Sequence, residues 1–198
     1  NEIMINRINS DLANDLGNLV SRTVAMVEKY FGGVIPIEKE SADIDNELID
    51  LALSLRGKVD AYMDETQINN ALAEIFKVIS RANKYIDETT PWLLAKDESK
   101  KARLQTVMYN LCETIRIVSV CLQPFLTKTP QKIFEKLGIK DESLLTFDSL
   151  VFGTMKPGQK VEKGEALFQR LDLVKELEIM DKIAEEEKAK ANKNKETK

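Results

Sequence analysis

The sequence predicts an all-α protein: an antiparallel helical bundle of four to five helices, then a short irregular or extended segment and a charged tail. Three observations support this fold class. Apolar residues recur at intervals of three and four through long stretches of the 198-residue chain, as on one buried face of a helix. Only 8 Gly and 5 Pro are present, too few for an all-β protein with many tight turns. The 43% apolar content is enough to bury a sizeable core.

The first two long stretches predict helices with clear ends. Residues 2–31 form the longest predicted helix. The Gly32-Gly33 pair should stop it, because glycine readily adopts the left-handed conformation that closes a helix. Ser41 or Asp43 can cap the second helix, since either side chain can accept a hydrogen bond from the first turn.

Three further helices follow along the chain. The third should begin at Asp64 or Thr66 and end before Pro91, because the residue that precedes a proline avoids helical angles. The fourth runs from about residue 97 to residue 122. A short fifth helix covers residues 129–138, where Thr129 is the expected cap, a proline follows it and a glycine closes the helix. Short connections between long helices favour antiparallel packing.

The chain is expected to divide into three parts. Residues 1–140 form the bundle, residues 141–173 an extended segment that packs on it, and residues 174–198 a charged linker or tail. Gly and Pro between residues 150 and 168 predict short extended pieces or a hairpin. The chain is helix-prone from residue 174. Residues 185–198 are mostly Glu, Lys, Ala and Asn with no apolar face, which predicts a solvated linker or a frayed tail.

The composition excludes several kinds of chemistry. The chain has no His, which removes His-containing zinc sites and Ser-His-Asp triads. Cys112 and Cys121 lie nine positions apart in one predicted helix, on opposite faces and about 13 Å apart, so they cannot form a disulfide. Free thiols fit a reducing, cytoplasmic compartment. With a net charge of −4, any binding to nucleic acid must come from a local patch.

Three polar residues of the first predicted helix form one row, since Asn14, Asn18 and Arg22 fall at i, i+4 and i+8. An Asn amide offers a donor and an acceptor side by side, and Arg offers a rigid fork of donors. Both groups suit reading a base edge or clamping a phosphate. A solvent-facing row with local hydrogen bonds explains the same pattern, and the residues alone leave both interpretations open.

Trp92, the only Trp, follows Thr90-Pro91 at the start of a helix. One interpretation is burial under the bundle, because apolar Leu93 and Leu94 come next. The other is an exposed stacking platform, the arrangement in which proteins hold unpaired RNA bases. Pro91 fixes the local backbone and favours an extended Thr90, which would present the indole rigidly.

Three stretches of the chain resemble a known family. Residues 6–22 (NRINSDLANDLGNLVSR) resemble the first helix of the anticodon-binding domain of bacterial methionyl-tRNA synthetases, and residues 83–92 (NKYIDETTPW) resemble a distinctive stretch of the same domain. Residues 167–172 (LFQRLD) are similar to the family's segment after the bundle, although many members have Pro where this chain has Gln169. The match runs from near Asn1 to about residue 173.

The resemblance implies a domain that recognises the CAU anticodon of methionine tRNA. Asn18 and Arg22 correspond to residues that contact anticodon bases, and Trp92 corresponds to the residue that stacks on the first of them. Asn14 and Pro91 are secondary candidates for the same site. The chemistry of these side chains is compatible with that role.

The resemblance also implies that the chain is part of a cytoplasmic methionine–tRNA ligase that uses ATP and Mg²⁺. The family's catalytic signatures, one with His and one a KMSKS loop, are both missing, so we expect no catalytic residue, cofactor or metal in this piece. Asn1 in place of Met and the Lys-rich end at Lys198 indicate a longer protein. The expected partners are the anticodon loop, the catalytic domain and a tRNA-binding dimerisation domain beyond Lys198, with no membrane.

Other hypotheses remain at this point. A helical bundle that binds only protein would bury Trp92 far from Asn18 and Arg22, whereas an RNA-binding module would expose it beside them. A self-sufficient enzyme is disfavoured, because no nucleophile–base pair and no metal-ligand set is evident. The anticodon domain of a related synthetase, for cysteine or isoleucine, should share the bundle but lack the Pro91-Trp92 match.

Overall fold

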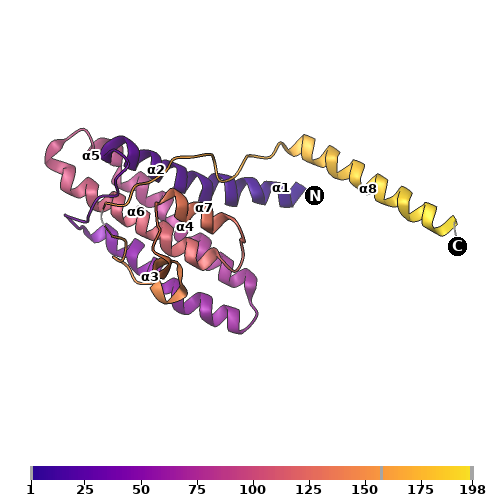
Figure 1. Ribbon diagram of the computed structural model, residues 1–198, viewed down its shortest axis with the longest axis horizontal. Helices are drawn as coiled ribbons and strands as arrows, with labels where there is room; N and C mark the ends of the chain where they lie inside the picture. Colours follow the sequence, from indigo (N-terminus) through magenta and orange to yellow (C-terminus); the bar gives the residue numbers. More distant parts are fainter. Residues whose placement is uncertain (1, 157, 197–198) are drawn as a thin grey trace.

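The prediction of an all-α antiparallel bundle is confirmed by the computed structural model (Figure 1), which describes residues 2–156 and 158–196, with side chains up to residue 187. One long helix opens the chain, and the other three long helices are α3 (Asp43–Asp64), α4 (Ile68–Thr89) and α6 (Lys101–Leu122). The shorter elements are α5 (Pro91–Leu94), η2 (Glu98–Lys100), α7 (Thr129–Lys136), η3 (Glu142–Leu145) and η4 (Phe147–Ser149), and α8 (Leu173–Glu196) ends the described chain.

The opening helix is continuous but has three parts, α1 (Glu2–Arg7), η1 (Ile8–Gly17) and α2 (Asn18–Phe31). Its middle part, η1, is a π-helix, a form that usually occurs as a single turn and often lies at a functional site. The helix ends as predicted, where Gly32 adopts a left-handed conformation with a φ of 60°. The wider winding of η1 changes how the side chains of residues 8–17 are spaced around the helix.

Side-chain contacts show the directions of the helices. Tyr85, late in α4, donates a hydrogen bond to Asp45 at the start of α3, and Glu74, early in α4, pairs with Lys58 near the end of α3. These two helices are therefore antiparallel. Arg103 at the start of α6 also contacts Asp45, so α6 runs in the same direction as α3.

The opening helix runs in the same direction as α4. The Asn83 side chain donates a hydrogen bond to the backbone carbonyl of Asp15, and Arg22 pairs with Asp87 four residues further along α4. The four long helices consequently alternate in direction along the chain. The C-terminal part of the opening helix and the N-terminal end of α6 therefore lie near the corner between α4 and α5.

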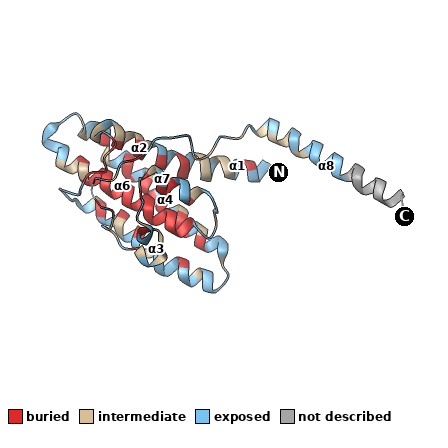
Figure 2. Cartoon of the chain, in the orientation of Figure 1, coloured by how far each residue is buried: buried red, intermediate tan, exposed pale blue. Residues whose placement is uncertain are grey.

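α6 is the central helix of the bundle (Figure 2). Every residue from Thr106 to Leu122 is buried, with α3, α4 and the opening helix packed around it. A helix that is covered all round needs partners for its polar residues as well as apolar neighbours. Cys112 and Cys121 lie within it as buried, free thiols, as predicted.

A buried ion pair on α6 organises the segment that follows α7. Arg116 and Glu113 are both fully buried and lie 3.0 Å apart. The Arg116 guanidinium also donates to the backbone carbonyls of Leu144 and Val151, at 3.0 and 2.9 Å. The Glu113 carboxylate accepts hydrogen bonds from the backbone N–H and the hydroxyl of Thr154, at 2.8 and 3.0 Å. Because this segment has little regular structure, these side chains take the place of a backbone ladder.

The hairpin that was one alternative for residues 150–168 is wrong for the part of that stretch that the structure describes. Lys160 instead forms an isolated antiparallel bridge with Val34, in the connection after α2. The sequence could not show this pairing, because the two residues are far apart in the chain. Gly138, which closes α7 at a φ of 66°, allows the approach, since a Cβ there would lie only 3.0 Å from the carbonyl carbon of Lys160.

Three predicted helix starts are also wrong. Ala42, rather than Ser41 or Asp43, occupies the cap position of α3, and its backbone N–H donates to the Asp45 carboxylate at 2.9 Å. α4 begins at Ile68 rather than at Asp64 or Thr66, because Thr66 adopts a positive φ of 61° in the turn between α3 and α4. Thr129 is not a cap, since it lies inside α7 and Lys128 occupies the cap position without a side-chain bond.

The C-terminal helix α8 extends away from the bundle (Figure 1). Its backbone is helical up to Glu196 rather than frayed, because Glu, Lys and Ala all have high helix propensity. Residues 185–187 are exposed to solvent, as predicted. Residues 197 and 198 of the predicted tail lie outside the described residues.

We predict that Glu113→Ala lowers the free energy of unfolding by about 3–5 kcal/mol, because it leaves the buried Arg116 charge without its partner. Urea denaturation followed by circular dichroism measures the change. Glu142→Ala, at an exposed position of η3, is the control and should leave the unfolding midpoint almost unchanged. An unaltered midpoint for Glu113→Ala would contradict the structural role of the pair.

Candidate nucleic-acid interface

A strained residue joins α4 to α5. Thr90 adopts the left-handed region, with φ 44° and ψ 60°, instead of the extended conformation that we expected. Pro91 disfavours the right-handed helical region for Thr90, and the left-handed conformation lets α5 follow α4 directly. A β-branched residue in this region costs about 1–3 kcal/mol, and strain of this kind is concentrated at functional sites.

The corner places Trp92 on the surface. In the single turn of α5, Pro91 is buried and Leu94 packs against the core, whereas Trp92 and Leu93 are 40% and 53% exposed. Of the two interpretations of Trp92, the structure therefore shows a presented indole. Pro91 fixes its own φ, so the backbone directly before Trp92 has little conformational freedom.

The polar row of the first helix lies in two environments. Asn14 and Asn18 are exposed and line one groove, whereas Arg22 is 32% exposed and its Nη2 lies 3.0 Å from Asp87 Oδ1. Asp87 lies in the last turn of α4, five residues before Trp92. This ion pair therefore connects the polar row to the corner from which Trp92 projects.

Sequence reasoning missed two residues of this surface. One is Asp87, whose pairing with Arg22 joins positions 65 residues apart. Phe168, which lines the groove with Asn14 and Asn18, comes from the segment after the bundle. No periodicity could have found either contact, although both residues lie inside the stretches that carry the family resemblance.

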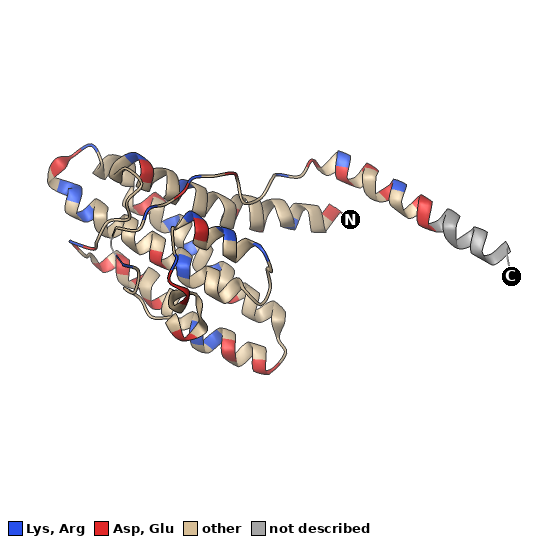
Figure 3. Ribbon diagram, viewed as in Figure 1, with Lys and Arg blue, Asp and Glu red and all other residues tan. Residues whose placement is uncertain are grey.

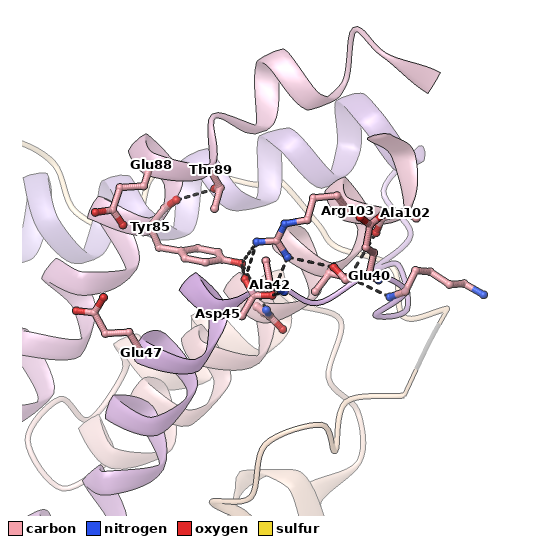
Figure 4. Close-up of polar contacts among 12 residues, drawn as sticks. Glu40, Ala42, Asp45, Glu47, Tyr85, Glu88, Thr89, Ala102 and Arg103 are labelled. Atoms are coloured by element: carbon pink, nitrogen blue, oxygen red, sulfur yellow. Dashed lines mark hydrogen bonds and ion pairs between the residues drawn. The ribbon is translucent and has the colours of Figure 1, made fainter. Parts of the chain in front are cut away.

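A hydrogen-bond network fixes the end of α4 beneath the site (Figure 4). The buried Asp45 carboxylate accepts hydrogen bonds from the Tyr85 hydroxyl at 2.5 Å and from both terminal nitrogens of Arg103, at 2.6 and 2.7 Å. The Thr89 hydroxyl then donates to the Tyr85 carbonyl at 2.6 Å. The first turns of α3 and α6 are thus bonded to the last turns of α4, directly before the Thr90 corner.

The same network shifts the titration of its members. Burial by itself would raise the pKa of the Asp45 carboxyl, but hydrogen bonds from Arg103, Tyr85 and the Ala42 N–H outweigh it and hold that pKa below its usual range. Burial, together with the neighbouring Asp45, raises the pKa of the Tyr85 hydroxyl. At neutral pH Asp45 is therefore ionised and Tyr85 is a neutral donor.

The described part of the chain offers binding groups rather than reacting groups. Within it, no cluster of three or more His, Cys, Asp or Glu side chains is placed to hold a metal ion. Burial raises the pKa of both thiols, that of Cys121 to about 12, so neither is a nucleophile at neutral pH. Acidic and basic residues are interspersed over the helices in this view (Figure 3). Among the described residues, no helix is both long and apolar enough to cross a membrane.

Fold and surface together define a class: a helical-bundle domain that presents an aromatic ring, amides and a guanidinium, the groups that proteins use to hold unpaired bases. A family model described as the anticodon binding domain of methionyl tRNA ligase matches residues 35–188. The chain belongs to that family. Membership rules out the cysteine and isoleucine synthetase alternatives.

Individual relatives agree with this assignment. The chain is 58% identical over 186 residues to a methionine–tRNA ligase of Caldanaerobacter subterraneus. This alignment covers 94% of the chain and 29% of the relative. It is 51% identical over 178 residues to the methionine–tRNA ligase of Bacillus subtilis, covering 89% of the chain and 27% of that protein. The free methionyl-tRNA synthetase of Mycobacterium tuberculosis superposes with a TM-score of 0.81 at 34% identity, over 87% of this chain and 35% of that one. The chain therefore spans less than a third of the curated relatives named here.

We predict that the Asp45 network makes stability depend on pH in the acid range. Because the pKa of Asp45 is lower in the folded than in the unfolded chain, its stabilisation is complete above the unfolded pKa and is lost as the pH falls through the folded value. Urea denaturation at a series of pH values from neutral to strongly acid measures the slope. Asp45→Asn should be less stable at neutral pH and should have a shallower slope, and parallel curves for the two proteins would contradict this account.

Proposed function

We propose that this chain binds the CAU anticodon loop of methionine tRNA as one domain of a methionine–tRNA ligase. The observation that carries the proposal is the exposed Trp92, presented at a strained corner that an ion pair connects to the row of Asn18 and Arg22. Membership of the anticodon-binding family supports an anticodon as the ligand of this surface.

Each side chain has a role that its chemistry allows. The Trp92 indole stacks on the first anticodon base, while Asn18 and Arg22 hydrogen-bond to base edges, with Asn14 and Pro91 as secondary contributors. The contact with Asp87 uses one end of the Arg22 guanidinium and holds the side chain in place. The other end of the fork can then meet a base without a search through rotamers.

The remaining functions of the ligase belong to other parts of the longer protein. Under this proposal the catalytic domain binds ATP, Mg²⁺ and methionine, and this chain positions the tRNA for it. A further tRNA-binding dimerisation domain beyond Lys198 and a cytoplasmic location are part of the same proposal.

A protein-binding bundle is the alternative, and the exposed Leu93 beside Trp92 is the observation that favours it. An apolar pair on the surface can serve a protein partner as well as a base. The two functions differ in how they respond to the anticodon sequence, and the variants below separate them.

We expect Trp92→Ala to lose about 1–3 kcal/mol of affinity for an anticodon stem-loop that carries CAU, because the stacking surface is removed. The melting temperature should hardly change, since the ring is exposed. Calorimetric titration measures affinity, and the fluorescence of Trp92 in the unaltered chain should be quenched by the same stem-loop. Leu93→Ala is the matched control on α5. Full affinity in Trp92→Ala would argue against the platform.

Arg22→Ala should weaken binding to the CAU loop by about 1–3 kcal/mol and reduce discrimination at the base that Arg22 reads. Arg22→Lys keeps the charge but loses the planar fork, so it should not restore discrimination. Titrations with CAU and altered anticodons measure both effects. Rescue by Lys, with equal losses for all anticodons, would identify a phosphate contact instead.

Finally, the purified chain should show no methionine-dependent exchange of pyrophosphate into ATP, because the sequence lacks both catalytic signatures of the family. The assay follows radiolabelled pyrophosphate with ATP, Mg²⁺ and methionine present. A full-length methionine–tRNA ligase is the positive control. Measurable exchange by this chain would overturn its assignment as a binding domain.

A further inference from the structure

The segment after the bundle is fastened to the opening helix by a reciprocal pair of hydrogen bonds. The Asn9 amide donates to the carbonyl of Leu171 at 2.9 Å, and the backbone N–H of Leu171 donates to the amide oxygen of Asn9 at 2.8 Å. The two residues are 162 positions apart. An Asn side chain that hydrogen-bonds to both the N–H and the carbonyl of one residue fixes where the segment lies along the helix.

Between this segment and the helix lies a groove of about 440 Å³, a size typical of small-molecule sites. Its helix wall carries the polar side chains of Asn14, Asn18 and Ser21, and its opposite wall includes Phe168, which is half-buried. Gly17 lies between the walls. A Cβ at Gly17 would lie 3.4 Å from Phe168 Cδ2, at van der Waals contact, so the ring lies directly against the helix backbone at Gly17.

The groove continues the row that leads to Trp92. Asn18 lines it, and Arg22 follows one turn later with its ion pair to Asp87 at the α4 corner. Asn18, which lines the groove, and Arg22, which contacts the corner, are one α-helical turn apart, about 6 Å along the axis from a rise of roughly 1.5 Å per residue. Stacked bases follow each other at about 3.4 Å, so a base edge held at Arg22 brings the neighbouring bases toward the part of the row where Asn18 lines the groove.

The walls of the groove match the two kinds of contact that an unpaired base makes. An aromatic ring offers a stacking face, and amide and hydroxyl groups can pair with a base edge. Among the described residues, those that line the groove include no Lys or Arg, so the side chains around it favour the base over the phosphate. The wall is also partly π-helical, a winding that often occurs at functional sites.

We propose that this groove is a second base-binding subsite, in which Phe168 stacks on an unpaired base of the anticodon loop other than the base held by Trp92, and Asn14 hydrogen-bonds to its edge. The inference rests on the proposed function, since it concerns the same RNA. It assigns Phe168, a residue outside the helical bundle, to recognition of the loop.

Calorimetric titration of the unaltered chain and of Phe168→Leu against a CAU anticodon stem-loop tests the subsite. Leu keeps apolar packing against Gly17 but removes the aromatic face, so the melting temperature should stay within about 4 °C. Binding should weaken roughly fivefold to 150-fold, the range measured for a stacked base. Phe152→Leu, at another half-buried Phe after the bundle, is the matched control and should bind as the unaltered chain does.

A second series replaces the loop nucleotides one at a time by abasic sites. For one nucleotide other than the first anticodon base, the abasic loop should bind the unaltered chain and Phe168→Leu equally, because the partner of the ring is gone. Asn14→Ala should show its loss at the same nucleotide. The subsite would be overturned if Phe168→Leu bound the intact loop as tightly as the unaltered chain does, or if the effect of Phe168→Leu disappeared only with the first anticodon base abasic. Either result would leave the proposed function intact. No binding of the CAU loop by the unaltered chain would overturn both.

Discussion

The Asp45 carboxylate is the contact on which the functional end of the molecule depends. It is buried at the start of α3 and takes hydrogen bonds from Tyr85 on α4 and Arg103 on α6, so three helices meet on one side chain. A buried charge is tolerated only with several partners, and its removal would leave Arg103 uncompensated. Because these bonds hold the last turns of α4, they allow the next residue, Thr90, to stay in a conformation that a free chain would leave.

A second buried pair has the same function for the rest of the chain. Glu113 and Arg116 bind the irregular segment after α7 through its backbone groups, and Asn9 fastens the later part of that segment to the opening helix. Neither contact belongs to a helix or a sheet. In both, side chains supply the hydrogen-bond partners that the backbone groups of an irregular segment need. The groove beside Asn14 exists only because this segment is held against the helix. The proposed RNA surface therefore combines elements from both ends of the chain.

The helices could be predicted because burying one face of each imposes apolar residues at intervals of three and four. The burial of every α6 residue from Thr106 to Leu122 could not, since the polar residues Glu113 and Arg116 resemble a solvent face until their partners are known. At the site, the residue types alone left the exposure of Trp92 undecided between two interpretations, and only the family resemblance favoured the stacking platform. The Arg22–Asp87 contact and the left-handed Thr90 depend on how α4 meets its neighbours, which no local pattern encodes.

The charge distribution bears on how such a domain would discriminate between tRNAs. Contacts to phosphate add affinity for every sequence, whereas contacts to base edges and faces distinguish one loop from another. This chain has a net charge of −4, and Asp87 offsets part of the field of Arg22. Under the proposed function, most of the binding free energy would therefore come from contacts with bases. A tRNA with a wrong anticodon would lose a large part of that free energy. Affinity for the whole tRNA need not come from this domain, because linkage to other tRNA-binding parts of one polypeptide raises the effective concentration of the loop at the site.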